Sequence, residues 1–522
     1  MKRSSTFLHQ LIHSLSPAEK RHFRVWAKQQ GKGSKQNYLL LFDAIDKQAE
    51  YNEEKLKAKF QKAAFIHYLS TAKSQLKDQI LEALHQYHSS NTTAEQLKKQ
   101  LHQIRLLSDR GFVEQAAKLL TQTSKAIQKA GLDYLLVEAL QVKQELFSRL
   151  FPIKLESIDP VAEEAQQLIE TLGIQFEQWR LLHELYSHYF RQMNPRSAEQ
   201  MAPYRSIEEH AFFSALPAEA TPHSQIEHAH MMARYHSILG NKETAQQAFR
   251  KALDGYAAYP ALKEQQTSRY INLLNNYLME CSSRRDYGPF EQGVEELNSL
   301  AKAPKLSRLH KAQAFAFSHI LQCERLWRER EFDQLLPILP QIESGLNEHE
   351  GLIQPQYVLL LNNALFNTYF IMEQYEAAMT WMEKTLADRK LESFQGVQAI
   401  ARIWNLMVHY ELDNWLLLDS ILVSSKRYFQ NRSIYFDAER QFIQSIQKVI
   451  HLPEGQPRKT AFRTLHEHLS VLKENEFEKQ LFHYFSLLEW VESQFSGIPF
   501  REILQQQKPG ASNVKKTGHP EG

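Results

Sequence analysis

Two stretches of this chain decide its fold class. One runs Gly240-Asn-Lys-Glu-Thr-Ala-Gln-Gln-Ala-Phe-Arg-Lys-Ala-Leu253, and the other runs Tyr375-Glu-Ala-Ala-Met-Thr-Trp-Met-Glu-Lys-Thr-Leu386. In both, apolar residues return every three to four positions, which is the spacing of one face of an α-helix. Small residues such as Ala245 and Ala378 allow two helix axes to approach to roughly 8 to 10 Å. Each stretch therefore predicts the second helix of a packed helical hairpin.

An aromatic residue follows each of four expected hairpin turns. These residues are Tyr287, Phe332, Tyr375 and Trp415, so the steps between them are 45, 43 and 40 residues. A nearly constant step with little residue identity is expected from stacked hairpins, because each needs only an apolar stripe facing its neighbours. The 17 Gly and 18 Pro among 522 residues are few for a turn-rich β architecture. The sequence predicts an all-α chain.

The quoted stretches resemble tetratricopeptide repeats, whose second helix carries a small residue, an apolar residue four positions on, and then a small residue with a leucine. The matching positions are Ala245, Phe249, Ala252 and Leu253 in the first stretch and Ala378, Met382 and Leu386 in the second. The resemblance covers about residues 95 to 450, with steps longer than the usual repeat of roughly 34 residues. It implies an α-solenoid of antiparallel helix hairpins whose inner face, lined by the first helix of each pair, binds peptides or partner proteins.

The sequence pattern divides the chain into three parts. Residues 1–90 predict a basic N-terminal helical domain, similar to the front end of bacterial repeat proteins, and Ser16-Pro17-Ala18-Glu19 predicts a capping box within it. Residues 91–505 predict the solenoid, with Gly240-Asn241, Gly288-Pro289 and Leu452-Pro453 among its turns. Residues 506–522 have nothing to bury and are expected to be disordered.

Composition limits the classes of protein to which the chain can belong. Cys281 and Cys323 are too few for a disulfide framework, which favours a cytoplasmic protein. No stretch reaches the roughly 18 apolar residues of a membrane span, so no membrane association is expected. Residues 1–90 hold 15 Lys and Arg against 8 Asp and Glu, or +7, so the remaining residues carry −5 of the net charge of +2. The oligomeric state is not defined by the sequence.

The resemblance also names candidate partner-binding residues. They are Glu227, His230 and Arg234 in one first helix and Asn363 and Asn367 in another. The two asparagines are four positions apart, so both amides point the same way and could bond an extended backbone. The alternative is that they are solvated polar positions, which is the commoner case.

No catalytic, cofactor-binding or metal-binding residue is predicted. His183 and His188 are five positions apart and diverge by about 140° around a helix, whereas the helical zinc motif needs histidines four apart. The cluster of His223, His228, His230 and His236 lacks a Cys or paired carboxylate in a ligand pattern. We therefore expect a non-enzymatic protein.

Two functions remain. The first is a scaffold that binds a peptide or partner protein on the concave face of the solenoid. The alternative is a regulator whose basic N-terminal domain binds nucleic acid while the solenoid senses a protein or peptide partner. The lysines that raise this alternative are Lys55, Lys57, Lys59, Lys62, Lys73 and Lys77. It is not favoured, because acidic residues dilute the basic patch and no arginine is available there to read bases.

Overall fold

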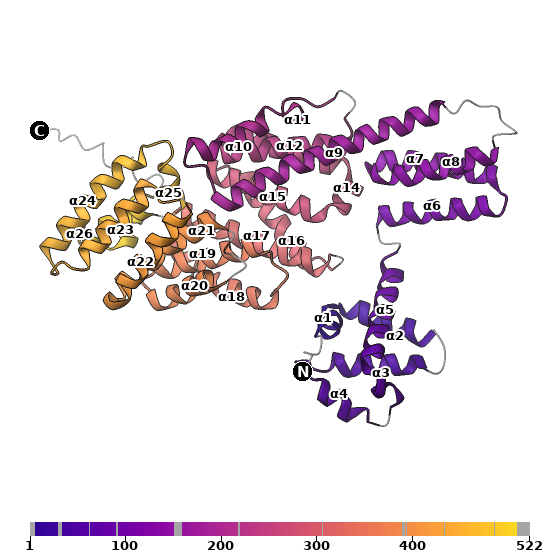
Figure 1. The fold of residues 1–522 in the computed structure, drawn as a ribbon, viewed down its shortest axis with the longest axis horizontal. Coiled ribbons are helices and arrows are strands. Elements are labelled where there is room, and N and C mark those ends of the chain that lie inside the picture. The colour runs from indigo at the N-terminus through magenta and orange to yellow at the C-terminus, as the bar shows by residue number, and fades with distance from the viewer. Residues whose placement is uncertain are drawn as a thin grey trace, which may run out of the picture. The chain divides into compact units, whose positions relative to one another are not determined.

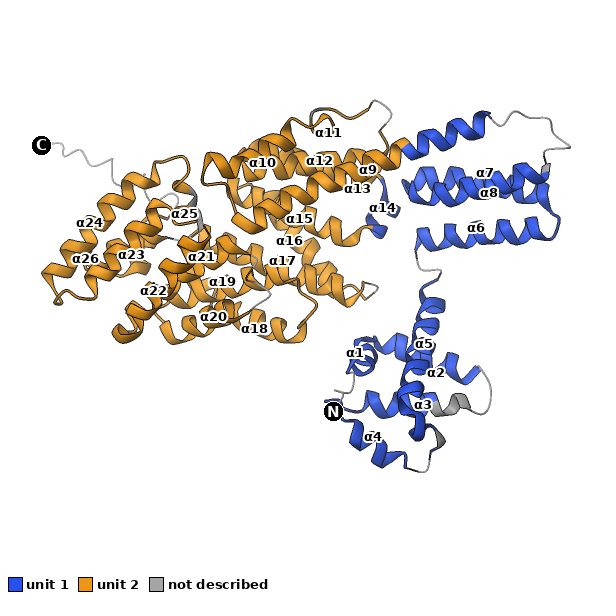
Figure 2. Cartoon of the chain, in the orientation of Figure 1, with its two compact units in different colours: residues 1–169, 259–265 blue, residues 170–258, 266–522 orange. Residues whose placement is uncertain are grey.

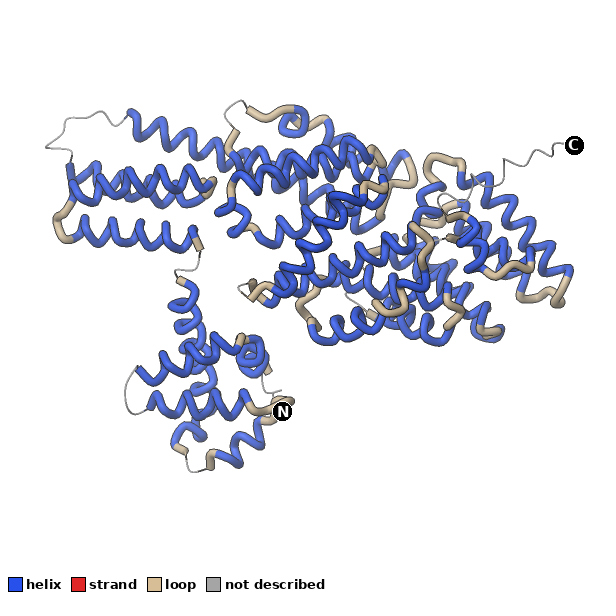
Figure 3. The backbone as a smooth tube through the Cα atoms, turned by 180° about the vertical axis from the view of Figure 1, so that it is seen from behind, coloured by secondary structure: helices blue, strands red, loops and turns tan. Residues whose placement is uncertain are grey.

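The computed structural model describes residues 6–29, 34–61, 63–89, 92–150, 159–217, 220–304, 306–388, 392, 394–432, 434–484 and 486–508. Throughout these ranges the regular structure is helical and no β-strand occurs (Figure 1; Figure 3). The expected all-α class is confirmed. Within the same ranges, no helix combines the length and the apolar character that crossing a bilayer requires.

The chain forms two compact units (Figure 2). The first comprises residues 1–169 together with 259–265, and the second comprises residues 170–258 and 266–522. Residue 90, the expected end of the N-terminal domain, lies inside the first unit. The tail predicted to be disordered starts at residue 506, which is the last residue of the final helix, and its residues 509–522 lie outside the described ranges.

The first unit contains an N-terminal bundle, the helices α6 to α8 and the short helix α14. The helices are α1 (Phe7–Ser14), α2 (Pro17–Gln29), α3 (Ser34–Asp46), α4 (Glu53–Lys59), the 3-10 helix η1 (Ala64–Tyr68), α5 (Leu69–His88), α6 (Thr93–Asp109), α7 (Val113–Ala130), α8 (Tyr134–Leu150) and α14 (Pro260–Gln265). The next helix, α9 (Asp159–Gln192), begins in the first unit and ends in the second.

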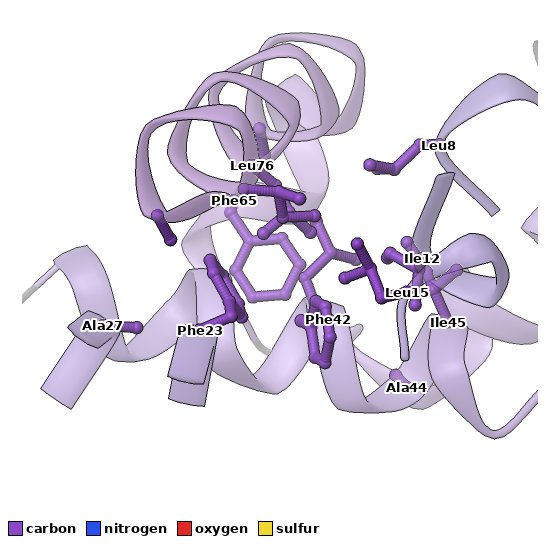
Figure 4. Close-up of a cluster of buried hydrophobic side chains, with 14 of the residues drawn as sticks. Leu8, Ile12, Leu15, Phe23, Ala27, Phe42, Ala44, Ile45, Phe65 and Leu76 are labelled. Carbon is purple, nitrogen blue, oxygen red and sulfur yellow. The ribbon is translucent and has the colours of Figure 1, made fainter. Parts of the chain in front are cut away.

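Helices α1 to α5 enclose a core of their own. Figure 4 shows Phe65 and Leu76 approaching Phe23 and Phe42 from the opposite side, and the rings of Phe23 and Phe42 are 4.6 Å apart. The residues of this core, from Leu8 to Leu84, all come from this N-terminal bundle. In the described part of residues 6–89, no polar or charged residue is fully buried. The bundle is therefore held by apolar contacts, as the hydrophobic effect favours.

The predicted capping box is confirmed at the start of α2. The Glu19 backbone N–H donates to Ser16 Oγ at 3.2 Å, and the Ser16 N–H donates to Glu19 Oε2 at 2.7 Å. These two reciprocal bonds satisfy donors that a helix N-terminus otherwise leaves without partners.

The second unit is a succession of helices that pack on their neighbours in chain order (Figure 1). After α9 they are α10 (Ala198–Glu208), α11 (Ala211–Ser214), α12 (Pro222–Ile238), α13 (Lys242–Ala258), α15 (Thr267–Arg284), α16 (Tyr287–Lys302), α17 (Arg308–Arg328), η2 (Phe332–Gln334), α18 (Leu339–Glu348), α19 (Pro355–Ile371), α20 (Tyr375–Ala387), α21 (Gln395–Glu411), α22 (Trp415–Asn431), α23 (Asp437–Val449), α24 (Gln456–Lys473), α25 (Lys479–Tyr484), α26 (Leu487–Ser496) and α27 (Phe500–Gln506). This order of packing is compatible with a helical-repeat protein.

One helix cap recurs through the second unit. Five residues with positive φ stand at the turn after a first helix, and they are Gly240, Arg285, Arg330, Glu373 and Asp413. The steps between them are 45, 45, 43 and 40 residues. In each cap the following N–H donates to the carbonyl five residues back, as Asp286 does to Cys281 at 2.9 Å and Gln374 to Tyr369 at 2.9 Å. This is the hydrogen bond of a Schellman motif.

The recurring cap confirms the turns that the aromatic residues predicted. Tyr287, Phe332, Tyr375 and Trp415 each stand two positions after one of these caps and begin the next helix. The turn expected at Leu452-Pro453 is also present, between α23 and α24.

The turn expected at Gly288-Pro289 was wrong, because both residues lie in the first turn of α16. Proline is tolerated there, since the first N–H groups of a helix have no partner within the helix.

The two signature stretches bury most of their pattern residues, but Leu253 and Leu386 are only half-buried. Ala245, Phe249 and Ala252 of α13 are fully buried, and so are Ala378 and Met382 of α20. The backbones of α12 and α13 approach closely, because a Cβ on Gly255 would lie only 2.5 Å from a side-chain carbon of Ile226. Small residues at this contact allow the close hairpin packing, and any larger side chain would force the helices apart.

Candidate functional site: the inner cluster of the second unit

Polar and aromatic side chains from four helices meet in the second unit. We name this set the inner cluster, and it consists of Tyr186 and Tyr189 from α9, His230 and Arg234 from α12, Asn272 and Asn276 from α15, and Tyr357 from α19. Tyr186 Oη is hydrogen-bonded to His230 Nε2 at 3.0 Å and accepts from Asn276 Nδ2 at 3.1 Å. Tyr357 Oη donates to Asn272 Oδ1 at 2.8 Å. These bonds join segments that are 44 to 90 residues apart in the sequence.

Glu227 lies one turn before the cluster on α12 and is paired. Only 2% of its surface is exposed, and its Oε1 is 2.5 Å from Arg269 Nη1. Burial raises the pKa of this carboxyl, but the hydrogen bond with His223 and the charge of Arg269 outweigh burial and lower the pKa to about 2. Glu227 is therefore ionised, and its charge is compensated by Arg269.

His230 is neutral at ordinary pH. It is 6% exposed, and burial lowers its pKa to about 4 because the charged imidazolium is poorly solvated in the interior. The nearby charge of Glu227 opposes this effect, while those of Arg269 and Arg234 reinforce it. A neutral imidazole fits its hydrogen bond with the Tyr186 hydroxyl.

Arg234 is a buried cation without a counter-ion. Arg234 is 8% exposed, and its guanidinium carbon lies 4.1 Å from the ring centroid of Tyr189 and 5.2 Å from that of Tyr186. Its Nε has no hydrogen-bond partner, and no carboxylate oxygen of the described residues lies within 4.0 Å of its nitrogens. Glu280 contributes to its electrostatic surroundings and accepts a hydrogen bond from Ser237.

The two predicted asparagines interact with one another. Asn367 Nδ2 donates to Asn363 Oδ1 at 2.6 Å, and both residues are half-buried on α19. The two amides therefore meet on one side of α19. This bond leaves the amide N–H groups of Asn363 and the carbonyl oxygen of Asn367, which are the donor and acceptor types that a peptide group needs.

Three of the predicted partner-binding residues are buried in the structure and do not line an open groove. Glu227, His230 and Arg234 share one side of α12, as predicted, but they are buried, because Tyr186 and Tyr189 of α9 lie against His230 and Arg234. Sequence reasoning missed the residues from α9, α15 and the start of α19. The available signal was the repeat step, since Tyr186 precedes His230 by 44 residues and Tyr189 precedes Arg234 by 45.

A second buried charge group joins the early and late parts of the second unit. Arg196 pairs with Glu439 and, at 2.7 Å, with Glu478, and its guanidinium stands 4.2 Å from the ring centroid of Phe436. Glu478 also accepts from the Asp437 backbone N–H at 2.9 Å. Burial raises the pKa of Glu439, and the charge of Arg196 opposes this. These contacts hold segments more than 240 residues apart against each other.

The described residues also contain a hollow and two buried cysteines. The hollow has a volume of about 200 Å³, lies between α16 and α17, and is lined by Phe290, Glu291, Val294, Arg325 and Leu326 among others, with Arg325 paired to Glu291. This is smaller than an ordinary ligand pocket of roughly 300 to 1,000 Å³. Burial raises the pKa of the Cys323 thiol to about 12, so it is a weak nucleophile. No group of three metal-ligating side chains occurs in the described ranges.

Three of the lysines that suggested nucleic acid binding are paired with acids, whereas no ion pair is found for Lys55 or Lys59 in the described residues. Lys57 contacts Glu53 and Glu54, Lys73 contacts Glu53 at 2.8 Å, and Lys77 contacts Asp78 at 2.9 Å. Lys62 lies outside the described residues. Cations that are already paired attract phosphates less strongly, so this surface is a poorer match to nucleic acid than its composition indicates.

Comparison of the chain with protein-family models, with curated proteins and with solved structures found no match in any of the three.

Proposed function

We propose that this protein is a scaffold that binds a partner polypeptide through a tetratricopeptide-like solenoid in its second unit. The observation that carries the proposal is the same helix cap at five successive turns, 40 to 45 residues apart. A repeated hairpin with one cap and one register produces a row of first helices, and such rows present extended binding surfaces.

The composition of the first helices supports a polypeptide ligand over a small molecule. Half-buried Tyr and Asn side chains of α9, α15 and α19 supply hydroxyl and amide groups together with aromatic rings. Amides and hydroxyls match the donors and acceptors of a peptide backbone, and aromatic rings supply contact area at low entropic cost.

Nucleic acid binding by residues 1–90 is the weaker alternative. Its support is the net charge of +7 in that segment, and the ion pairs of Lys57, Lys73 and Lys77 count against it. Retardation of duplex DNA by the full chain, weakening steeply with salt, would revive it.

Site-specific photo-cross-linking tests the scaffold proposal. A photoreactive amino acid replaces Asn363 of α19, which is the first helix of its hairpin. The full chain is expressed in the cells that naturally produce it. The matched control carries the same residue at Val471 of α24, which is 74% exposed. We expect one partner, or a few, to be cross-linked from position 363 and not from position 471.

The competing outcomes are distinct. Asn363→Ala and Asn367→Ala should weaken recovery of the same partner when the cross-linker is moved to Asn272. Identical adducts from positions 363 and 471, or adducts from neither, would contradict binding on this side of the second unit.

A further inference from the structure

The inner cluster contains a positive charge, that of Arg234, which no nearby carboxylate balances in the described residues. Three ionisable residues of α12 share one side of the helix, at positions 227, 230 and 234. The charge of Glu227 is compensated by Arg269, and His230 is neutral because of its burial. Arg234 is thus left as a buried cation that no carboxylate in the described residues pairs.

An unpaired buried guanidinium is costly for a protein to keep. Removing an ion from water costs several kcal/mol even after relaxation. Stacking on Tyr189 and Tyr186 offsets part of this cost, a hydrogen bond with Tyr189 adds to this offset, and the Nε donor remains without a partner. A buried arginine that is held by two tyrosines and by no carboxylate is able to receive an anion from outside the chain.

The chemistry around Arg234 selects the anion. A guanidinium matches a carboxylate with two parallel hydrogen bonds. Phosphate carries nearly two negative charges, and Arg234 is the one cation of the inner cluster in the described residues, so a monoanion fits better. The neighbouring groups, from Asn272, Asn276 and Tyr357, are the amides and hydroxyls suited to a peptide backbone.

The burial of Arg234 indicates whether the carboxylate belongs to a side chain or to the C-terminus of the partner. Arg234 is 8% exposed, whereas Tyr189 and Asn276 are half-buried. A backbone lying on these residues can send a glutamate or aspartate side chain inward to the guanidinium. A C-terminal carboxylate is attached directly to its Cα, so the partner backbone itself would have to enter the buried region around Arg234.

We propose that Arg234 receives the side-chain carboxylate of an acidic residue in the bound partner, between the rings of Tyr186 and Tyr189. This inference rests on the proposed function and specifies the chemistry of the partner. The partner segment is extended, carries Glu or Asp at the position above Arg234, and loses affinity when that residue becomes Gln or Asn.

The test uses synthetic peptide pools and the immobilised full chain. The first pool contains random nonapeptides with a central Glu and an amidated C-terminus, and the second has Gln in place of Glu. The third has the central Gln and a free C-terminus. We expect the wild-type chain to retain the Glu pool about tenfold better than the other two, and Arg234→Met to reduce this ratio to about one.

Two further variants separate binding from folding. Arg234→Met should melt at the same temperature as the wild type or higher, because it removes an unpaired buried charge. Arg234→Lys keeps the charge without the planar fork and should keep only part of the preference, and it serves as the test if Arg234→Met does not fold. Arg250→Met, an exposed arginine of α13, is the matched control and should keep the full preference.

Equal retention of the Glu and Gln pools would overturn the inference. A Glu preference that survives Arg234→Met, or a free C-terminus that outcompetes the central Glu, would also overturn it. Retention of no pool by the wild type would also overturn it, while the scaffold proposal would still be judged separately by cross-linking at position 363.

Discussion

The N-terminal bundle and the second unit differ in what they bury. In the described part of residues 6–89 every fully buried residue is apolar. The second unit buries charged residues as well, including Glu227, Arg234, Glu280, Glu439 and Glu478. Buried charges do not usually add stability relative to apolar residues of the same size. The bundle core is therefore apolar throughout its described residues, whereas the second unit also contains buried ion pairs and a buried arginine without a carboxylate partner.

The largest expected effect comes from breaking a buried charge group of the second unit. Arg196→Met leaves Glu439 and Glu478 buried without their cation, which should lower the free energy of unfolding by about 4 kcal/mol. Urea denaturation of the full chain, followed by hydrogen exchange in α23, measures it. The control Arg440→Met breaks a half-exposed pair with Asp437 and should cost less than about 1 kcal/mol. Equal effects would erase the contrast between buried and surface charges.

The next effect should stay within the N-terminal bundle. Leu76→Ala removes a fully buried side chain of α5 and should cost about 3 kcal/mol, since it leaves a cavity in the apolar core. Hydrogen exchange should quicken in α1 to α5 and remain unchanged in α12 to α24. Leu81→Ala, on the same helix but 48% exposed, is the matched control. Faster exchange throughout the second unit would show that the bundle core is not separate.

A smaller, pH-dependent effect should be confined to the second unit. The pKa of His230 is about 4 when folded, below its ordinary value of 6.5, so the unfolded chain binds the proton more readily. The stability contributed by His230 is therefore full above pH 6.5 and is lost as the pH falls toward 4. Between pH 7.5 and 5 this loss should be about 2 kcal/mol.

The variant His230→Gln tests this loss directly. Its free energy of unfolding should fall less between pH 7.5 and 5 than that of the wild type, because glutamine does not titrate. His183→Gln changes an exposed histidine of α9 and should leave the pH dependence as it is. If the two variants behave alike, the burial of His230 does not control its protonation.

The smallest effect concerns the helix cap that the second unit repeats. Glu373 is exposed and has a φ of 58°, a conformation in which an L side chain is strained, so Glu373→Gly should stabilise by about 0.5 to 1 kcal/mol. Gly240 fills the same position in another hairpin, with a φ of 81° and no atom near its absent Cβ. Gly240→Ala should therefore destabilise by about 1 kcal/mol through backbone strain alone. Thermal melts measure both, and effects of the same sign would show that the caps are not equivalent.

Much of the helical framework could be predicted from the sequence. The capping box at Ser16 and the turns before Tyr287, Phe332, Tyr375 and Trp415 depend on residues only a few positions apart. The exception, Gly288-Pro289, arose because the signals that mark a turn also suit the first turn of a helix.

Less of the candidate site could be predicted. The resemblance gave Arg234 and His230 as neighbours on one side of α12, but not the tyrosines of α9 that lie against them. Whether a polar residue on a first helix is open or buried depends on the hairpins before and after it.

The sequence by itself determined that this protein is helical and where its hairpins turn, because helix periodicity and capping are local properties of the chain. Only the tertiary structure decided that Tyr186 meets Asn276 and that Arg196 meets Glu439. Such contacts depend on the angle at which successive hairpins stack. That angle is set by side-chain packing between them, which no local pattern specifies.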